Sequence, residues 1–312
     1  MVTALLALTL VAFDWKLPAG FPLPIAGANV QTQTKFDLGR RLFYDRRLSA
    51  NGKQSCSDCH QQRFAFSDGR ARAAGSTGQQ HPHNAMTLTN AGYNLSYTWT
   101  DTRVTTLEQQ ALVPMFNEHP IELGVKGHEK EIVARLRADP AYESMFRDAF
   151  PRERNAIDIA HVARALAAFE RALISGHSAY DRLVYGGEQN ALSPAEWRGM
   201  QLFFSAHAGC SSCHQGFNFS GEVRYAGKKP DRPHLVSNGV TPGAFRVPTL
   251  RNIALTAPYM HDGSIATLAE VIDRYSEARK LALTNGEKSD LLAFLESLTD
   301  YEFIADTRFA AP

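Results

Sequence analysis

Cysteine is scarce in this chain: four of its 312 residues are Cys, too few for the disulfide framework of a small secreted protein. An excess of one charge is also lacking, because 33 Lys and Arg face 32 Asp and Glu, for a net charge of +1 at pH 7. Nucleic-acid binding requires a basic surface, so we expect no nucleic-acid partner. The chain also has no apolar run of about 18 residues, so we expect no membrane span.

The longest apolar run covers only about ten residues, from Ala4 to Phe13, half the length of a membrane span. It suits the apolar core of a secretory signal, although Met1-Val2-Thr3 lacks the usual positive charge. We interpret residues 1–13 as the remnant of a secretion signal, and a buried N-terminal strand or helix is the alternative. The Pro-rich stretch from Lys16 to Gln33 predicts an extended arm.

All four cysteines fall in two copies of the pattern Cys-x-x-Cys-His. Two thiols three residues apart can form thioethers with the two vinyl groups of one haem, and the adjacent His then becomes the proximal ligand of the iron. The sequence therefore predicts two covalently bound c-type haems. The two motifs comprise Cys56, Cys59 and His60, and Cys210, Cys213 and His214.

Three other interpretations of the Cys-x-x-Cys-His residues explain the motifs less well than haem attachment. A zinc site built from both motifs would leave His60 and His214 without a function. A thioredoxin-like redox pair needs no His and belongs in a βαβ setting, and disulfides between residues three apart are strained. Because bacteria attach haem through thioethers outside the cytoplasm, the motifs also predict a periplasmic protein.

The segments before the two motifs are alike. Residues 38–44 (LGRRLFY) and 198–204 (RGMQLFF) each predict a short amphipathic helix that leads into a haem-attachment loop. The copies lie about 150 residues apart, which is a domain-sized period. We therefore predict a mainly α fold with two tandem cytochrome c-type haem domains, over residues 30–186 and 187–312.

Further helices follow from the spacing of apolar residues. Ile159 to Leu173 repeats an apolar residue every three or four positions, and residues 129–150 carry a similar stripe. Thr284 and Glu287 form a capping-box pattern ahead of an apolar run. These segments favour the mainly α class.

Six more motifs carry a resemblance to a known family. Together with the two haem motifs, they resemble the bacterial diheme cytochrome c peroxidase/MauG family over residues 35–300. The stretch ALVPMFNEHPIELG, residues 111–124, is most similar to MbnH-type enzymes, which are diheme relatives of MauG paired with a copper-binding partner protein. The six motifs are LGRRLFYDRRLS (38–49), TLEQQAL (106–112), PIELG (120–124), RVPTLRN (246–252), PYMHDG (258–263) and TLAEV (267–271).

The resemblance implies that the haem on His60 reacts with peroxide. In peroxidases of the family a second His can cap this iron, and the corresponding position here lies near Ser76, which cannot play that part. His81 and His83 are close by but displaced. We therefore expect an open, five-coordinate iron, and capping by His81 or His83 is the alternative.

The haem on His214 needs a sixth ligand. Peroxidases of the family use a Met after the TLxE segment, MauG-like members have Tyr, and this chain has Tyr275 at that position. A phenolate stabilises high-valent iron, whereas Met favours the reduced state. The alternative is that Tyr275 packs in the core and Met260 binds the iron.

The resemblance also assigns two residues to the distal side of the reactive haem. Glu122 matches the acidic residue that takes a proton from bound peroxide and delivers it to the departing oxygen, and Gln110 matches a distal amide. An exposed loop carboxylate and a helix-surface Gln are the alternatives. The spacing between the two residues is longer than in typical peroxidases.

The resemblance also assigns an electron-transfer residue and a calcium site between the two haem units. Trp99 stands where an indole can pass electrons from one haem to the other, and a core Trp is the alternative. Asn84, Thr256 and Pro258 match a calcium site, through one side-chain oxygen and two backbone carbonyls.

The resemblance implies an enzyme that uses hydrogen peroxide to form a high-valent bis-haem state and then oxidatively modifies a partner protein, turning a Trp into kynurenine. That partner would be a copper-binding, MbnP-like protein. The second hypothesis is a diheme peroxidase that reduces hydrogen peroxide to water with electrons from a small redox protein, and the third is a plain electron carrier.

Overall fold

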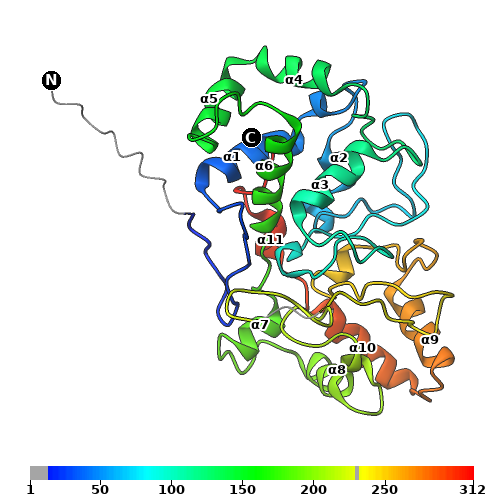
Figure 1. Cartoon of the computed structure of the whole chain (residues 1–312). Coiled ribbons are helices and arrows are strands. Elements are labelled where there is room, and N and C mark those ends of the chain that lie inside the picture. The colour runs from blue at the N-terminus through cyan, green and yellow to red at the C-terminus, as the bar shows by residue number, and fades with distance from the viewer. Residues whose placement is uncertain (1–12, 229–231) are drawn as a thin grey trace.

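The computed structural model describes residues 13–228 and 232–312 (Figure 1). Residues 1–12, which hold nearly all of the predicted signal remnant, lie outside this range. Eleven α-helices make up the described part, where strand pairing is limited to isolated bridges, so the mainly α prediction is confirmed. Within the same residues no helix is long and apolar enough to cross a membrane. The helices are α1 Gln33–Tyr44, α2 Cys56–Cys59, α3 Leu107–Phe116, α4 Glu129–Arg137, α5 Pro140–Ala149, α6 Ile159–Arg171, α7 Ala179–Val184, α8 Pro194–Phe204, α9 Leu268–Ala278, α10 Asn285–Glu296 and α11 Tyr301–Ala305.

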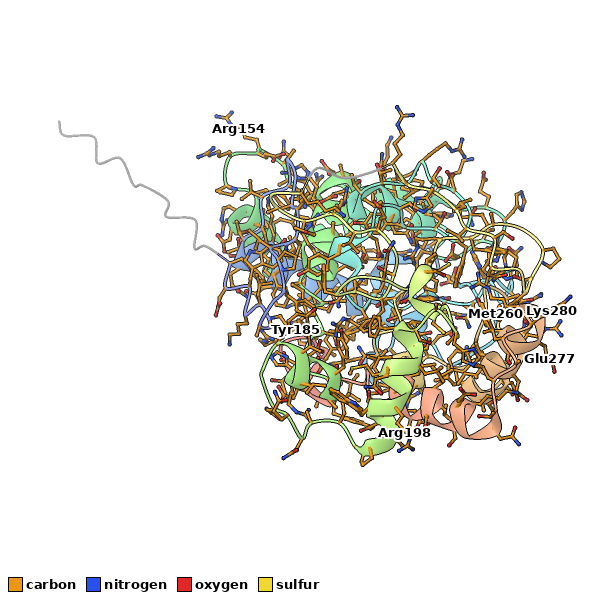
Figure 2. The ribbon with its side chains drawn as sticks, turned by 90° about the horizontal axis from the view of Figure 1, so that it is seen from below. Arg154, Tyr185, Arg198, Met260, Glu277 and Lys280 are labelled. Carbon is orange, nitrogen blue, oxygen red and sulfur yellow. The ribbon has the colours of Figure 1, made fainter. Side chains whose placement is uncertain are left out.

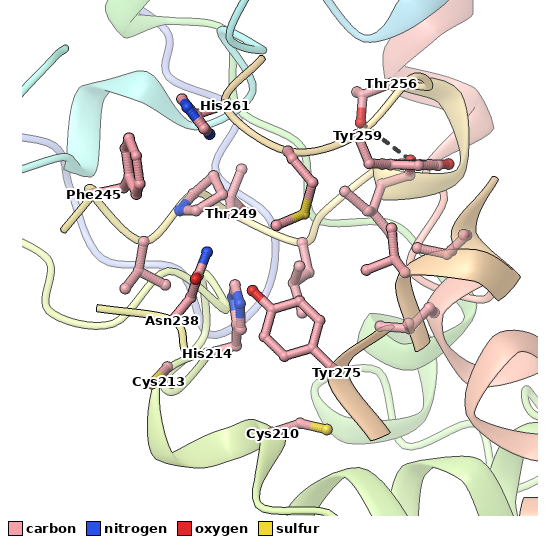
Figure 3. Close-up of a pocket in the computed structure, with 18 of the residues that line it drawn as sticks. Cys210, Cys213, His214, Asn238, Phe245, Thr249, Thr256, Tyr259, His261 and Tyr275 are labelled. Carbon is pink, nitrogen blue, oxygen red and sulfur yellow. Dashed lines mark hydrogen bonds between the residues drawn. The ribbon is translucent and has the colours of Figure 1, made fainter. Parts of the chain in front are cut away.

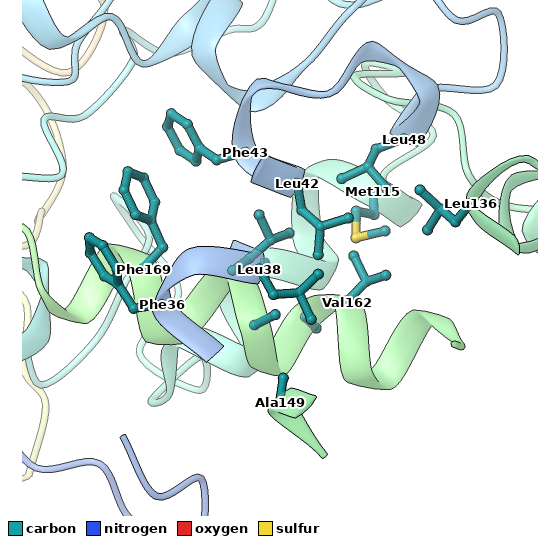
Figure 4. Packing of buried hydrophobic residues seen from close by; sticks show 14 of the residues in the cluster. Phe36, Leu38, Leu42, Phe43, Leu48, Met115, Leu136, Ala149, Val162 and Phe169 are labelled. Carbon is teal, nitrogen blue, oxygen red and sulfur yellow. The ribbon is translucent and has the colours of Figure 1, made fainter. Parts of the chain in front are cut away.

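A first core forms where α1 crosses α6 (Figure 4). Leu38, Leu42 and Phe43 of α1 are fully buried, and the Phe43 ring lies 5.0 Å from that of Phe169. The backbones come so close that a Cβ on Gly39 would stand 2.0 Å from the carbonyl oxygen of Ala165. The Gly of the LGRRLFY segment is therefore the residue that lets the two helices touch.

A second core repeats this arrangement between α8 and α10. A Cβ on Gly199 would stand 1.9 Å from the carbonyl oxygen of Asp290, and Phe203 and Phe294 are buried beside the crossing. Beside this contact the exposed Arg198 of α8, labelled in Figure 2, pairs with Asp290 of α10 at 2.6 Å. The similarity of the two flanking segments thus corresponds to two similar helix crossings, each next to a haem-attachment motif.

The predicted helical stripe over residues 129–150 is interrupted. The chain forms α4 up to Arg137 and restarts as α5 at Pro140. Asp139 caps α5 by accepting a hydrogen bond from the N–H of Ala141, at 3.0 Å. Proline cannot continue a helix but suits its first turn, which explains why one stripe makes two helices. The helix over Ile159–Arg171 and the Thr284–Glu287 capping box are confirmed.

Two terminal segments tie the two cores together. The predicted extended arm is confirmed, because no helix precedes α1 from Phe13 onward. Within this arm Phe21 packs edge-on against Phe217 of the second haem-attachment region, with the ring centres 5.0 Å apart. At the other end, Phe303 and Phe309 return to the first core. The domain limits 30–186 and 187–312 remain predictions.

Candidate active site

The first haem-attachment motif folds into a short helix that ends at its His. α2 carries both thiols, and Asp58 accepts a hydrogen bond from the N–H of Ser55 at 2.8 Å, which closes a capping box. The Nδ1 of His60 donates to the carbonyl oxygen of Phe66, at 2.9 Å. This contact leaves Nε2 free to bind a metal. Burial lowers the pKa of His60, so the imidazole is neutral, as an iron ligand must be.

The second motif has the same local geometry. Cys210–Ser212 forms a single 3₁₀ turn, and the Nδ1 of His214 donates to the carbonyl oxygen of Phe219 at 3.0 Å. Phe66 and Phe219 both have positive φ, 62° and 49°, which turns each chain back over its His. Burial also lowers the pKa of His214. Both imidazoles are therefore held in the orientation and tautomer of a proximal ligand.

The thiols are free, which is the state that haem attachment requires. All four Cys are unpaired, so the disulfide alternative fails. Burial raises the pKa of Cys59 and of Cys210 to about 11. Across residues 13–228 and 232–312, no group of three or more His, Cys, Asp or Glu side chains could hold a metal ion, so the zinc alternative fails as well.

A largely apolar cavity opens beside His214 (Figure 3). Tyr275 enters it from α9 with its hydroxyl directed toward His214, and Met260 also lines it. Burial raises the pKa of Tyr275, while the positive charge of Arg279 opposes that shift. Both residues that sequence analysis weighed as sixth ligands are thus present in one cavity.

One buried cation in this cavity has no counter-charge among the residues that the structure describes. Arg246 lines the cavity, its Nε is buried without a hydrogen-bond partner, and burial lowers its pKa to about 10. It forms no ion pair with any described residue. Because an unpaired buried charge is costly, a missing anionic group is expected here. A haem, an apolar ring with two carboxylates, fits both the apolar lining and Arg246.

Glu122 lies close enough to Cys59 of the first motif to influence its thiol. Its charge, after burial and Asp68, is one of the causes that raise the pKa of Cys59. Burial raises the pKa of Glu122 itself, while His81 and a hydrogen bond from Asn117 oppose the shift. A carboxyl with a raised pKa holds its proton more readily than an ordinary Glu, which suits a group that accepts and then returns a proton.

Gln110 stands on α3, and its side-chain oxygen is buried without a hydrogen-bond partner. A buried amide oxygen without a partner costs desolvation free energy, and a bound ligand that donates a hydrogen bond can offset that cost. A distal amide is expected to have this property. Its place in the middle of α3 is also compatible with an ordinary helix residue.

The loop that carries Ser76 is fixed to the segment that carries Glu122. The N–H of Ser76 donates to the carbonyl oxygen of Glu122 at 2.8 Å, and the N–H of Ile121 donates to the side-chain oxygen of Gln79 at 2.9 Å. Gly75 allows this approach, because a Cβ there would meet the Ile121 carbonyl oxygen. His81 follows at the end of the loop, with its Nε2 4.0 Å from Oε1 of Glu122.

Comparison with known proteins agrees with this geometry. The family described as "Di-haem cytochrome c peroxidase" matches residues 33–190. The methylamine utilization protein MauG of Methylorubrum extorquens is 34% identical over 302 residues, covering 91% of this chain and 83% of that protein. Cytochrome c551 peroxidase of Nitrosomonas europaea is 34% identical over 289 residues, covering 88% and 83%. This chain belongs to the di-haem cytochrome c peroxidase family.

A solved structure supports the same assignment. A MauG-like protein associated with microbial copper homeostasis is 41% identical, with a TM-score of 0.91, and the match covers 96% of this chain and 99% of the other. As a member of this family the chain is a peroxide-dependent diheme oxidoreductase with two c-type haems. The expected fold, with two cytochrome c-type haem units, is confirmed.

Trp99 is joined by hydrogen bonds to the segments that carry Asn84 and Arg246. Its indole N–H donates to the carbonyl oxygen of Asn84 at 3.0 Å, and its own carbonyl accepts from the N–H of Arg246 at 2.9 Å. Trp99 also lines the cavity beside His214, as do Asn84, Thr256 and Pro258. The side-chain amide of Asn84 donates to the carbonyl oxygen of Arg70 at 2.7 Å, which leaves its oxygen available.

Sequence analysis assigned no function to two buried polar residues. Arg246 lies within the RVPTLRN motif, but only the fold reveals that its Nε is buried without a hydrogen-bond partner. Asp68 follows the first motif by eight positions; its Oδ1 accepts from the N–H of Arg70 at 3.0 Å, and its Oδ2 is buried without a partner. Its pKa is raised by burial, and its charge acts on His60. No pattern in the sequence distinguishes it from an ordinary loop Asp.

Proposed function

We propose that this protein uses hydrogen peroxide to oxidise a Trp side chain of a partner protein, with kynurenine as the end product. Two peroxides supply the four oxidising equivalents and the two oxygen atoms that cleave the C2–C3 bond of the indole and give N-formylkynurenine and two waters, and hydrolysis then releases the formyl carbon as formate. The observation that carries the proposal is Tyr275, whose hydroxyl enters the cavity beside His214 at the position where family peroxidases have Met. A phenolate favours oxidised over reduced iron. The haems, when bound, supply the reduction of peroxide and the storage of two oxidising equivalents.

The residues of the chain have separate tasks in this reaction. His60 and His214, each fixed through Nδ1, hold the two haems, and Arg246 neutralises acid groups on the second. Glu122 takes a proton from peroxide and returns it to the departing oxygen as water leaves. Gln110 offers a buried oxygen beside that exchange. Trp99 lies between the units and carries electrons between them.

The substrate proposal draws on the similar proteins. The MauG-like relative is associated with copper homeostasis, which supports a copper-binding, MbnP-like partner protein. A protein substrate is too large to enter the haem cavity, so its electrons must cross the protein surface. We also propose that the protein is periplasmic, and that Asn84, Thr256 and Pro258 hold a calcium ion between the two units.

One observation favours a second candidate function. Met260 lines the same cavity as Tyr275, and a Met ligand is what reductive peroxidases of the family use. Several of the relatives are named cytochrome c peroxidases. In this case the protein would reduce hydrogen peroxide to water with electrons from a small redox protein.

The deciding experiment incubates the diferric holoprotein with the copper-binding partner and hydrogen peroxide, followed by mass spectrometry of the partner. A mass gain on one Trp supports the proposed modification. Rapid turnover with a reduced small cytochrome, dependent on prior half-reduction and without change in the partner's mass, supports the peroxidase instead.

A further inference from the structure

His81 lies next to the carboxyl group of Glu122. The Nε2 of His81 lies 4.0 Å from Oε1 of Glu122. The side chains are 27% and 25% exposed, so the pair is partly buried yet reaches solvent. At 4.0 Å the contact is longer than a hydrogen bond, and one bridging water or a small rotation of either side chain would close it.

The contacts of His81 suit both of its protonation states. Its Nδ1 accepts a hydrogen bond from the backbone N–H of His83 at 3.0 Å, which places the proton of the neutral ring on Nε2, facing Glu122. The same Nδ1 lies 3.3 Å from the His83 carbonyl oxygen, which can accept a hydrogen bond from the imidazolium form. Neither state leaves the ring without a local partner.

The backbone fixes this pair from both sides. The N–H of His81 donates to the carbonyl oxygen of Ala73 at 2.8 Å, which closes the loop. The loop is bonded to the Glu122 segment through Ser76 and Gln79, as described above. These bonds hold the two backbone segments next to one another, so a small side-chain rotation or one water is enough to join the imidazole and the carboxyl.

Few other charges face the pair. On the loop itself His83 stands 5.8 Å from His81, ring centre to ring centre, and His261 of the second unit stands 5.5 Å from His83, with Asp262 beside it. On the haem side, Cys59 is consumed as a thioether once haem is attached. Burial lowers the pKa of His83, with the neighbouring imidazoles as further causes, so His83 is neutral at pH 7. Among the described residues, His81 is the one basic side chain with a nitrogen within 4.0 Å of a Glu122 carboxyl oxygen.

We propose that His81 is a positioning residue that acts through Glu122, passing protons from solvent to the distal carboxyl. This rests on the proposed function, or on its peroxidase alternative, because both reduce peroxide. One peroxide takes up two electrons and two protons as its O–O bond breaks and two waters form. The donor protein supplies the electrons. Glu122 moves the proton already present on peroxide, and the two protons that complete the second water enter through His81.

The test uses the holoprotein with His81→Gln and His81→Ala, and follows the reaction with hydrogen peroxide by stopped flow from pH 5 to 9. We expect His81→Gln to slow proton-dependent turnover by about ten-fold or more and to alter the pH profile. Added imidazole should restore His81→Ala, which a merely structural role would not allow. His128→Gln is the matched control, because His128 pairs with Glu131 at 3.1 Å on the exposed face of α4.

Glu122→Gln separates failure of this inference from failure of the proposed function. If Glu122→Gln stops the peroxide reaction while both His81 variants keep the wild-type rate and pH profile, the role of His81 is overturned and the function stands. If neither residue matters, the acid–base assignment fails together with the relay. If His81→Ala changes the resting spectrum from six- to five-coordinate iron, His81 is an iron ligand and the relay is overturned.

Discussion

Gly199 of α8 lies so close to Asp290 of α10 that a side-chain carbon on the glycine would meet the Asp290 carbonyl oxygen at 1.9 Å. Gly39 has the same relation to Ala165 in the first core. Each crossing sits next to a haem-attachment motif, so close helix contact and haem position are linked in both units. The two glycines are therefore needed for packing, and not for an unusual backbone conformation.

The first prediction concerns this contact. Gly199→Ala should destabilise the second unit by about 1–3 kcal/mol, because backbone must shift to make room for the methyl group. Thermal unfolding of the holoprotein, followed by circular dichroism, measures the effect. Gly286→Ala in α10 is the control: its nearest neighbour is 4.0 Å away, and Ala is the better helix former, so the midpoint should stay or rise. Equal midpoints for Gly199→Ala and wild type would refute the packing argument.

The second prediction concerns the cavity beside His214. Tyr275→Phe removes the hydroxyl that enters it. We expect the high-valent bis-haem state to absorb in the near infrared after peroxide addition, and the variant should lose both this absorption and the oxidation of the partner. Tyr275→Met should instead raise peroxidase turnover with a reduced small cytochrome. Tyr259→Phe is the control, because Tyr259 lines the same cavity but its hydroxyl contacts the Ile253 carbonyl, at 3.2 Å. Unchanged absorption in Tyr275→Phe would leave Met260 as the ligand.

Local signals predicted much of this molecule. The two Cys-x-x-Cys-His motifs and the repeated segments before them are short-range patterns, and both appear in the structure as similar turns and crossings. Pro140 by itself predicts the break after Asp139, but the continuous apolar stripe over residues 129–150 favours a single helix. In contrast, the missing counter-charge of Arg246 and the proximity of His81 to Glu122 depend on which loops meet in space. Residue spacing along the chain contains no such information.

The third prediction concerns pH. Burial raises the pKa of Glu122, and the carboxylate is the form that accepts a proton from peroxide. The rate constant for peroxide should therefore fall as pH drops through that raised pKa, at a higher pH than an ordinary Glu would give. Glu122→Gln should be slower by about a hundred-fold and lose this dependence. Glu118→Gln, in the same segment but exposed and paired with Lys126 at 2.5 Å, should keep the wild-type profile. Stopped-flow spectroscopy measures both variants.

The fourth prediction concerns Glu170 of α6, a buried carboxyl that the proposed reaction does not use. Burial raises its pKa to about 8, and its Oε2 has no hydrogen-bond partner. A carboxyl whose pKa is higher in the folded state stabilises the fold fully below its unfolded pKa, and this contribution is lost as pH rises through the folded value. Wild-type stability should therefore decline between about pH 5 and 8.

Glu170→Gln removes the titrating group while keeping the shape of the side chain. The variant should be more stable than wild type by about 1 kcal/mol or more at pH 9, and the difference should shrink toward pH 5, because the wild-type carboxyl is then neutral. Thermal unfolding of the two holoproteins at several pH values measures this. Glu143→Gln on the exposed face of α5 should follow wild type at every pH. A Glu170→Gln variant that loses stability equally at pH 5 and pH 9 would mean that the carboxyl has a partner in the holoprotein, and that its charge is needed rather than tolerated.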